Sequence, residues 1–322
     1  MTELHGVHDF VDDPRNRDVL VSVNGALVHR DDAKVSVFDA GYLLGDGVWE
    51  GFRVVEGGVA FLDAHLDRLY DGAKVLDMDI GLSRGELTER LFACLRANRM
   101  TDGVHVRLMV TRGIKRSPYQ GPRFTVTAPT VVIIPEHKTP VPEVIARGQR
   151  LVTVHVRRTG PAEQDQKLNS HSKLNCILAC IQADKAGADE ALMLDPDGFV
   201  ATCNSTHFFV VRDGEVWTSP PEYCLGGITR ANVLRLCEEA GIPAREKRFS
   251  LFDVYTADEA FVTGTFAGLC SVREVDGRTL PPLPGPVTGK LQELYGALVR
   301  RSSTPIPPAP PERSTAGERG GA

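Results

Sequence analysis

The 322-residue sequence has no apolar run that approaches the ~20 residues of a membrane-spanning helix. Its first 18 residues are polar and acidic, and they lack the basic and apolar regions of a secretory signal. The net charge of −5 is mild, which disfavours nucleic acid or an anionic membrane as a partner. These absences predict a cytoplasmic protein that binds neither nucleic acid nor a membrane.

The sequence also lacks a cysteine framework. Its seven cysteines are odd in number and scattered, and no two form a CxxC pair, which disfavours both disulfides and a zinc site. Cys176 and Cys180 lie four residues apart on a predicted helix, a spacing that could hold a metal. Free cysteine more often packs as a small hydrophobic residue, so we predict no metal site.

The chain does contain many hairpin signals. Asn24-Gly25 and Asp213-Gly214 each separate two apolar runs and are typical of tight β-turns. Helical apolar spacing is found over 62–78 and 83–100, where Ser83 and Glu86 predict a capping box. Hairpins outnumber β-α-β units, so we predict a mixed α/β protein of the α+β kind and not a doubly wound parallel sheet.

The length allows two domains. Prolines between residues 138 and 150 suggest a connector, and the Pro-, Gly- and Ser-rich end of the chain suggests disorder. We therefore predict a loosely attached N-terminal arm at 1–18, a small α/β domain at 19–137, a connector at 138–150, a large domain at 151–302 and a disordered tail at 303–322.

Three features suggest a phosphate site. In LGGITRANV, two glycines precede a helix whose first turn holds Thr229 and Arg230, and free amides at a helix N-terminus attract phosphate. The same residues also fit a plain glycine turn with a threonine cap. The second feature is the small hydroxyl-bearing run VTGT at 262–265. The third is Arg68, because a guanidinium matches phosphate oxygens.

Two lysines, Lys167 and Lys173, lie where a polar stretch runs into a helical one. A lysine amine attacks carbonyl groups when it is desolvated or close to another cation. Together with a phosphate site, this chemistry suggests the phosphorylated aldehyde pyridoxal phosphate. Either lysine could equally be a solvated surface charge.

Five motifs then occur in a fixed order over about residues 20 to 300: SVFDAGYLLGDGVWEGFR, HLDRL, GADEALMLDPDGFV, GITR and DEAFVTGT. In them the chain resembles the class IV aminotransferases of fold type IV, which include branched-chain and D-amino-acid aminotransferases and aminodeoxychorismate lyase. The resemblance implies two α/β domains with pyridoxal phosphate in the cleft between them. It also implies a homodimer that acts on an amino acid and a 2-oxo acid.

The resemblance assigns residues to the cofactor and to the substrate. Arg68, the backbone amides of Ile228 and Thr229 after Gly227, and the Thr265 hydroxyl would bind the cofactor. Arginines would lie on the substrate side, where a guanidinium suits a carboxylate. The candidates are Arg53, Arg107, Arg112 and Arg116, each of which could also be a surface residue.

The cofactor lysine departs from the family pattern. In relatives it lies about 18 or 19 residues before the glycine that matches Gly187, and an ungapped count reaches Asn169 or Leu168 instead. If the helix begins early, Lys173 is one turn beyond Asn169 and on the same face, so we favour it. Lys167, with a short insertion, is the alternative, and the absence of any covalent link is the third option.

The second departure is Thr202, which lies where relatives carry a glutamate that contacts the pyridine nitrogen. A neutral hydroxyl does not stabilise a protonated pyridine as a carboxylate does. His207 lies where relatives often have asparagine. We therefore predict an aminotransferase, with a lyase or racemase of the same fold, and a non-catalytic ligand-binding relative, as alternatives.

Overall fold

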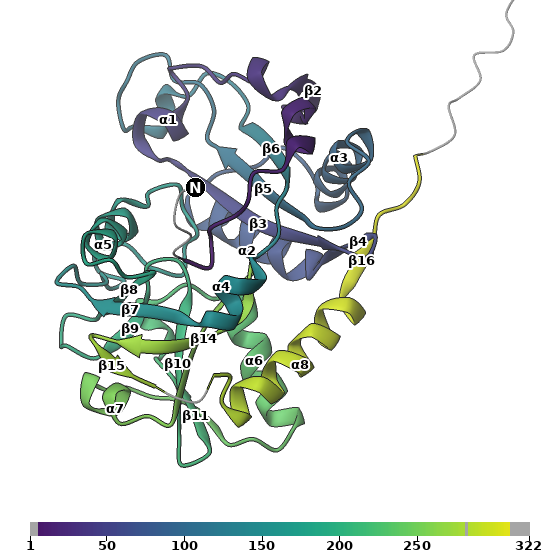
Figure 1. The fold of residues 1–322 in the computed structure, drawn as a ribbon. Helices are drawn as coiled ribbons and strands as arrows, with labels where there is room; N and C mark the ends of the chain where they lie inside the picture. Colours follow the sequence, from purple (N-terminus) through teal and green to yellow (C-terminus); the bar gives the residue numbers. More distant parts are fainter. Residues whose placement is uncertain (1–5, 281–282, 310–322) are drawn as a thin grey trace, which may run out of the picture.

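A computed structural model describes residues 6–280 and 283–309, which form two lobes (Figure 1). The small lobe is built on a seven-stranded, wholly antiparallel sheet in the order β16-β4-β3-β5-β6-β1-β2. Its strands are β1 (Leu20–Val23), β2 (Ala26–His29), β3 (Gly47–Val55), β4 (Gly58–Ala60), β5 (Val104–Thr111), β6 (Thr130–His137) and β16 (Ser303–Pro305). Its helices are α1 (Ala40–Leu44), α2 (Leu62–Val75) and α3 (Arg84–Ala97), with short 3-10 turns at Pro14–Asp18, Arg30–Asp32 and Pro122–Phe124.

The large lobe contains a nine-stranded mixed sheet in the order β12-β11-β10-β13-β14-β7-β8-β9, with β15 paired to β14. Its strands are β7 (Gln149–Thr153), β8 (Glu190–Leu194), β9 (Val200–Cys203), β10 (His207–Arg212), β11 (Glu215–Thr218), β12 (Ala244–Glu246), β13 (Glu259–Gly264), β14 (Gly268–Val275) and β15 (Arg278–Thr279). Its helices are α4 (Pro142–Arg147), α5 (Leu174–Lys185), α6 (Ile228–Glu239), α7 (Leu251–Tyr255) and α8 (Pro286–Arg301), with a 3-10 turn at Pro221–Tyr223. The predicted mixed α/β class is confirmed.

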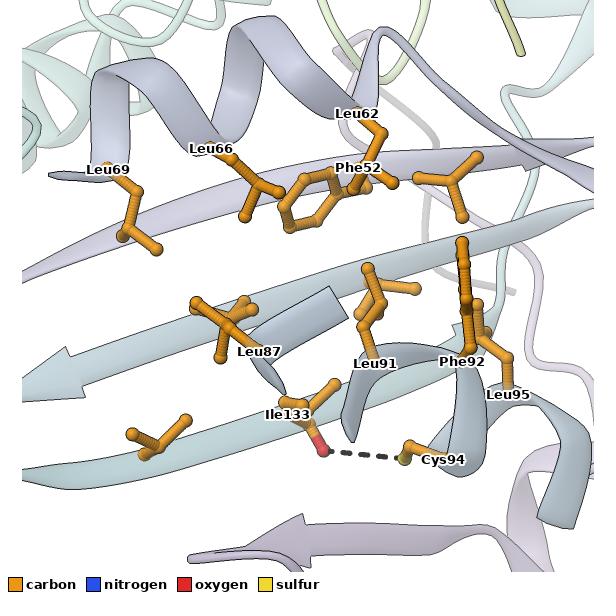
Figure 2. Packing of buried hydrophobic residues seen from close by; sticks show 14 of the residues in the cluster. Phe52, Leu62, Leu66, Leu69, Leu87, Leu91, Phe92, Cys94, Leu95 and Ile133 are labelled. Carbon is orange, nitrogen blue, oxygen red and sulfur yellow. Dashed lines mark hydrogen bonds between the residues drawn. The ribbon is translucent and has the colours of Figure 1, made fainter. Parts of the chain in front are cut away.

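Strand alternation gives the small sheet two different faces. On β5, Val106 and Leu108 are fully buried beneath α2 and α3, whereas Arg107 between them points to the opposite face. Figure 2 shows the buried side, where leucines of both helices pack against Phe52 of β3. The capping box of Ser83 and Glu86 is present at the start of α3. The opposite face carries Arg107 and His105, and the His105 ring contacts Phe266 of the large lobe.

Three predicted segments differ from the structure. Ser303–Pro305 pairs with β4 as an edge strand, so the expected disordered tail is wrong there, and residues 310–322 lie outside the described part. An edge strand tolerates proline, so a Pro-rich sequence does not exclude a strand at this position. The connector at 138–150 contains α4 and the first residues of β7. We propose that the two lobes correspond to the predicted domains 19–137 and 151–302.

The N-terminal arm is not loosely attached over residues 6–18. The Asn16 side chain donates to the His137 carbonyl and accepts from the His137 amide, at 2.9 and 2.7 Å. Val7 is buried in the core of the large lobe. The arm therefore contacts both lobes, which its polar composition did not indicate.

Leu91 tests the packing of the small lobe, because it is fully buried between α3 and the sheet. We expect Leu91→Ala to lower the free energy of unfolding by about 2–5 kcal/mol, since truncation leaves a cavity. Val75→Ala, at a 70% exposed position on α2, should change it by less than about 0.5 kcal/mol. Denaturant titrations measure both, and similar losses in the two variants would contradict this packing.

Candidate active site

Lys173 lies at the N-cap of α5 and points to the small lobe. Its Nζ donates to Oδ1 of Asn169 at 3.1 Å and lies 5.4 Å from the ring centroid of Trp49. Burial, together with the nearby positive charges of Arg158, Arg68 and Arg107, lowers its pKa to about 8, against an opposing effect of Cys176. Lys173 thus combines partial desolvation with neighbouring cations, the two conditions that make a lysine amine nucleophilic at neutral pH.

Lys167 has a different environment. Its side chain is 57% exposed, and its Nζ lies 3.6 Å from the carboxylate of Asp165 on the loop surface. Nothing around it removes water from the amine. Of the two predicted lysines, the structure brings only Lys173 to the other site residues.

Asn169, the residue at which the ungapped count back from Gly187 ends, bonds to Trp49 of β3. Its Nδ2 donates to the Trp49 carbonyl at 2.6 Å, and the Trp49 amide donates back to the Asn169 carbonyl at 3.1 Å. The indole Nε1 of Trp49 also donates to the Ser170 carbonyl at 3.1 Å. These bonds join the loop before α5 to β3. The helix begins at Leu174, so the expected early start is wrong, and Lys173 reaches the Asn169 side chain from the end of this loop.

Arg68 lies on α2 and is oriented by a buried carboxylate. Its Nε and Nη2 donate to Glu50, both at 2.7 Å, and its Nη1 donates to the Gly226 carbonyl of the large lobe at 2.8 Å. His65 Nδ1 also contacts Glu50, at 2.6 Å. Burial by itself would raise the pKa of Glu50, but hydrogen bonds from His65 and Arg68 and their charges lower it. Glu50 therefore remains ionised and holds the guanidinium beside the glycine turn.

The glycine turn ends at Gly227, the N-cap of α6. Within residues 6–280 and 283–309, the N–H groups of Ile228 and Thr229 have no hydrogen-bond acceptor. Such free amides, beside Arg68, attract an anion such as a phosphate. A Cβ on Gly227 would lie 2.4 Å from Cε1 of His207, so only glycine fits there. The Thr229 hydroxyl is 3.2 Å from the Tyr295 hydroxyl.

His207 is a neutral neighbour of this turn. Burial and, to a smaller extent, the charge of Arg230 lower its pKa to about 3. Its Nε2–H donates to the Leu225 carbonyl at 2.7 Å, which fixes the ring against Gly227. The neutral histidine therefore packs against Gly227 and bonds to the Leu225 carbonyl, and it adds no positive charge to the turn.

Thr202 and Thr265 are two further residues that are predicted to contact the cofactor. Thr202 is buried on β9, and its hydroxyl donates to the Thr206 carbonyl at 2.9 Å. The Glu190 carboxylate nearby accepts from Ser205 and Thr206. Thr265 is half-buried just after β13, directly before Phe266.

The four predicted arginines fall into two groups. Arg53 and Arg107 lie on the sheet face opposite the helices, and the Arg107 guanidinium is 4.0 Å from the Trp49 ring centroid. Arg112 uses its donors within the small lobe, on the Asp46 carboxylate and the carbonyls of Leu76 and Asp77. Arg116 is exposed beside Phe124. We therefore keep only Arg53 and Arg107 in the candidate site.

Sequence reasoning missed several residues of the site. Arg158, a buried residue, donates through Nη1 to the Cys176 sulfur at 3.0 Å and to Asn175 Oδ1 at 3.3 Å, just below Lys173. Glu50 and Trp49 were quoted within a motif but received no role. A carboxylate in an otherwise apolar strand was the available signal for Glu50, because buried charges require partners.

The pKa of Lys173 can be tested directly. In the cofactor-free chain, the acylation rate of Lys173 should rise to half its maximum near pH 8, because only the neutral amine reacts. Peptide mapping after brief labelling across a pH series measures this rate. A midpoint close to the ordinary lysine value of about 10.4 would show that the amine is not desolvated.

The chain is similar to proteins of a known family. The family model described as "Amino-transferase class IV" matches residues 47–275. A branched-chain-amino-acid aminotransferase-like protein 2 of Arabidopsis thaliana is 42% identical over 91% of this chain, but the chain spans only 53% of that relative. A branched-chain-amino-acid aminotransferase of Pseudomonas aeruginosa is 37% identical, over 88% of this chain and 94% of its own length.

The chain is also similar to a relative that is named for a D-amino acid and to a solved structure. A D-alanine aminotransferase of Listeria monocytogenes is 32% identical over 88% of this chain and 96% of its own. The crystal structure of a branched-chain amino acid aminotransferase with pyridoxamine 5'-phosphate superimposes with a TM-score of 0.82, at 30% identity, over 90% of this chain and 99% of that one. The resemblance read from the five motifs is confirmed, and the chain belongs to the class IV aminotransferase family.

Proposed function

We propose that this chain is a pyridoxal-phosphate-dependent aminotransferase. It would transfer an amino group between an amino acid, of the branched-chain or D-amino-acid type, and a 2-oxo acid. The observation that carries the proposal is Lys173, a partly desolvated amine that faces Trp49 and Asn169 near the Arg68–glycine turn. The chain is similar to relatives named for both substrate types, so both types stay in the proposal.

The residues present fit the cofactor. The free amides of Ile228 and Thr229 and the guanidinium of Arg68 would hold its phosphate, and Thr265 would add a hydroxyl. The close packing of Gly227 against His207 leaves no room for a side chain where a ligand would approach the turn. When bound, the cofactor supplies an aldehyde that condenses with amines and a ring that takes up electrons from the substrate carbon.

Different side chains of the protein would take the catalytic, orienting and substrate-binding roles. Lys173 Nζ would hold the cofactor and would then carry a proton as general acid and base, for which a pKa of about 8 is well matched. Asn169 orients this nitrogen through the 3.1 Å hydrogen bond. Arg53 and Arg107, which have no ion-pair partner among the described residues, would bind a substrate carboxylate.

Thr202 supports a second candidate, a lyase or racemase of the same fold. Its hydroxyl is neutral and already bonded to the Thr206 carbonyl, so it cannot hold a protonated pyridine as a carboxylate would. A panel of L- and D-amino acids with several 2-oxo acids distinguishes the candidates, because amino transfer at ordinary rates counts against the second. A non-catalytic cofactor-binding relative is the third candidate, and it would bind the cofactor without a covalent link.

Borohydride reduction of the cofactor-loaded chain, followed by peptide mapping, should place the pyridoxyl mark on Lys173. Lys173→Ala should lose the mark and lower amino transfer at least about 10²–10⁴-fold, since the general acid–base is removed. Lys167→Ala is the matched control and should retain both. A mark on Lys167 would transfer the role to that residue, and a mark on neither would remove the aminotransferase proposal.

We also propose a homodimer in the cytoplasm. Leu174, Ile177, Leu178 and Ile181 are 43–66% exposed and form one apolar stripe along α5. The stripe adjoins the α1 region, because the Ser172 hydroxyl just before α5 donates to the Gly45 carbonyl at 3.4 Å. Exposed Tyr42 of α1 borders a hollow of about 470 Å³. A second copy would cover this continuous apolar surface. The seven free cysteines support a reducing compartment.

Sedimentation velocity at micromolar concentration tests the dimer. Ile177→Asp should produce monomers, because it places a charge in the centre of the proposed interface. Phe252→Asp changes a residue that is 68% exposed on α7, away from the stripe, and should remain dimeric. A monomeric wild-type chain would contradict the proposal.

A further inference from the structure

Tyr295 of α8 lies against the start of α6. Its side chain is buried, and its hydroxyl is 3.2 Å from the hydroxyl of Thr229, which is buried as well. Burial raises the pKa of Tyr295, against opposing effects of the hydrogen bond with Thr229 and the charge of Arg53, so the phenol keeps its proton at neutral pH. The bond therefore holds the Thr229 side chain, directly beside one of the two free amides that follow the glycine turn.

The Tyr295 side chain also contacts the small lobe. Its ring packs on the ring of Phe61, with the centroids 6.0 Å apart and the planes tilted by 30°. Phe61 is the N-cap of α2, the helix that carries Arg68 about two turns later. Tyr295 therefore contacts the first residues of both helices that supply the candidate phosphate ligands.

The chain after α8 fixes Phe61 a second time. Figure 1 shows α8 running from the large lobe to β16, which pairs with β4 at the edge of the small sheet. Just before β16, the carbonyl of Ser302 accepts a hydrogen bond from the Phe61 amide at 3.0 Å. Phe61 has a φ of 52°, a left-handed conformation that a bulky residue seldom adopts, so the contacts around it must hold it there.

Apolar packing around Tyr295 also crosses from one lobe to the other. Ala60 of β4 belongs to the same buried cluster as Leu291 and Leu298 of α8. Gly268 of β14 lies close to the tyrosine ring, where an added Cβ would come within 3.2 Å of Cε1. The ring is therefore confined by both lobes, and the position of its hydroxyl relative to Thr229 is fixed.

The candidate phosphate site is divided between the lobes. Arg68 belongs to the small lobe, whereas the amides of Ile228 and Thr229 belong to the large one. Charge-assisted hydrogen bonds need donor–acceptor distances of about 2.7–2.9 Å, so these groups bind one phosphate only at a set separation. The bond from Arg68 to the Gly226 carbonyl is one contact that sets this separation, and Tyr295, which touches both helices, is another.

We propose that Tyr295 is a positioning residue for the phosphate group of the ligand. Its hydroxyl holds Thr229 and its ring holds the start of α2, so the two lobes present their phosphate-binding groups at the separation that one phosphate requires. This inference rests on the phosphate site of the proposed function and adds the residue that aligns the two halves of that site. Tyr295 acts through Thr229 and Phe61 and not by contact with the phosphate.

The test is a titration of the full chain with pyridoxal phosphate, pyridoxal and inorganic phosphate. Quenching of tryptophan fluorescence reports the two pyridoxal compounds, because the Trp49 ring centroid is 5.4 Å from Lys173 Nζ, and phosphorus NMR reports inorganic phosphate. We expect Tyr295→Phe to weaken pyridoxal phosphate and inorganic phosphate about 3- to 10-fold, because one hydrogen bond is lost. The affinity for pyridoxal, which has no phosphate, should stay within about twofold, whereas a general loss of structure would weaken all three ligands.

Tyr255→Phe is the matched control. The Tyr255 hydroxyl of α7 donates to Asp276 at 2.8 Å, so this variant also removes one tyrosine hydrogen bond, and it should leave all three affinities unchanged. Tyr295→Leu removes the ring as well as the hydroxyl, and it should weaken pyridoxal phosphate more than Tyr295→Phe does. In a Thr229→Val background, Tyr295→Phe should cause no further loss, because the two hydroxyls act as one pair.

Unchanged affinity of Tyr295→Phe for both phosphate-bearing ligands would overturn the proposal, as would a loss that affects pyridoxal equally. Neither readout requires turnover. A chain that binds phosphate through Tyr295 but carries no pyridoxyl mark would support this inference and reject the proposed catalysis. A chain that carries the mark on Lys173, and whose Tyr295→Phe variant loses no phosphate affinity, would do the reverse.

Discussion

The ionised carboxylate of Glu50 is the group on which the candidate site depends. It is fully buried, and burial of a charge is unfavourable unless partners compensate for it. Arg68 and His65 supply that compensation from α2. Once Arg68 is held by its Nε and Nη2, its remaining nitrogen can reach the Gly226 carbonyl of the other lobe. One buried charge thereby sets the position of the guanidinium beside the free amides at the start of α6.

A second set of contacts joins the lobes at the lysine. Backbone and side-chain bonds between Asn169 and Trp49 fix the loop that precedes α5 onto β3. Lys173 then extends from the N-cap of α5 to a point that the shorter Asn169 side chain also reaches. A change in the position of a lysine along the sequence is thus compatible with a similar position of its amine, because the loop before α5 brings Lys173 and Asn169 within hydrogen-bond distance.

Sequence patterns predicted the elements well where the signal was local. Helical spacing predicted α2 and α3 with ends that extend about three residues too far, and the capping box of Ser83 was correct. Elsewhere, residues that are distant in the sequence decide the environment of a side chain or segment. Arg112 is occupied by Asp46, which is 66 residues away, and β16 forms only because β4 offers a free edge. The N-terminal arm is polar, yet it is anchored by Gln149 and His137.

The sequence by itself determined the family motifs and their order, the mixed α/β class, the glycine turn before α6 and the shortlist of two lysines. Each of these is contained in contiguous residues, and local conformation follows from them directly. Only the tertiary structure decided that Lys173 is the desolvated amine, that Arg68 meets a carbonyl 158 residues away, and that Tyr295 contacts both Thr229 and Phe61. Burial and electrostatic environment are created by groups that are remote in the chain, so no local pattern of residues contains them.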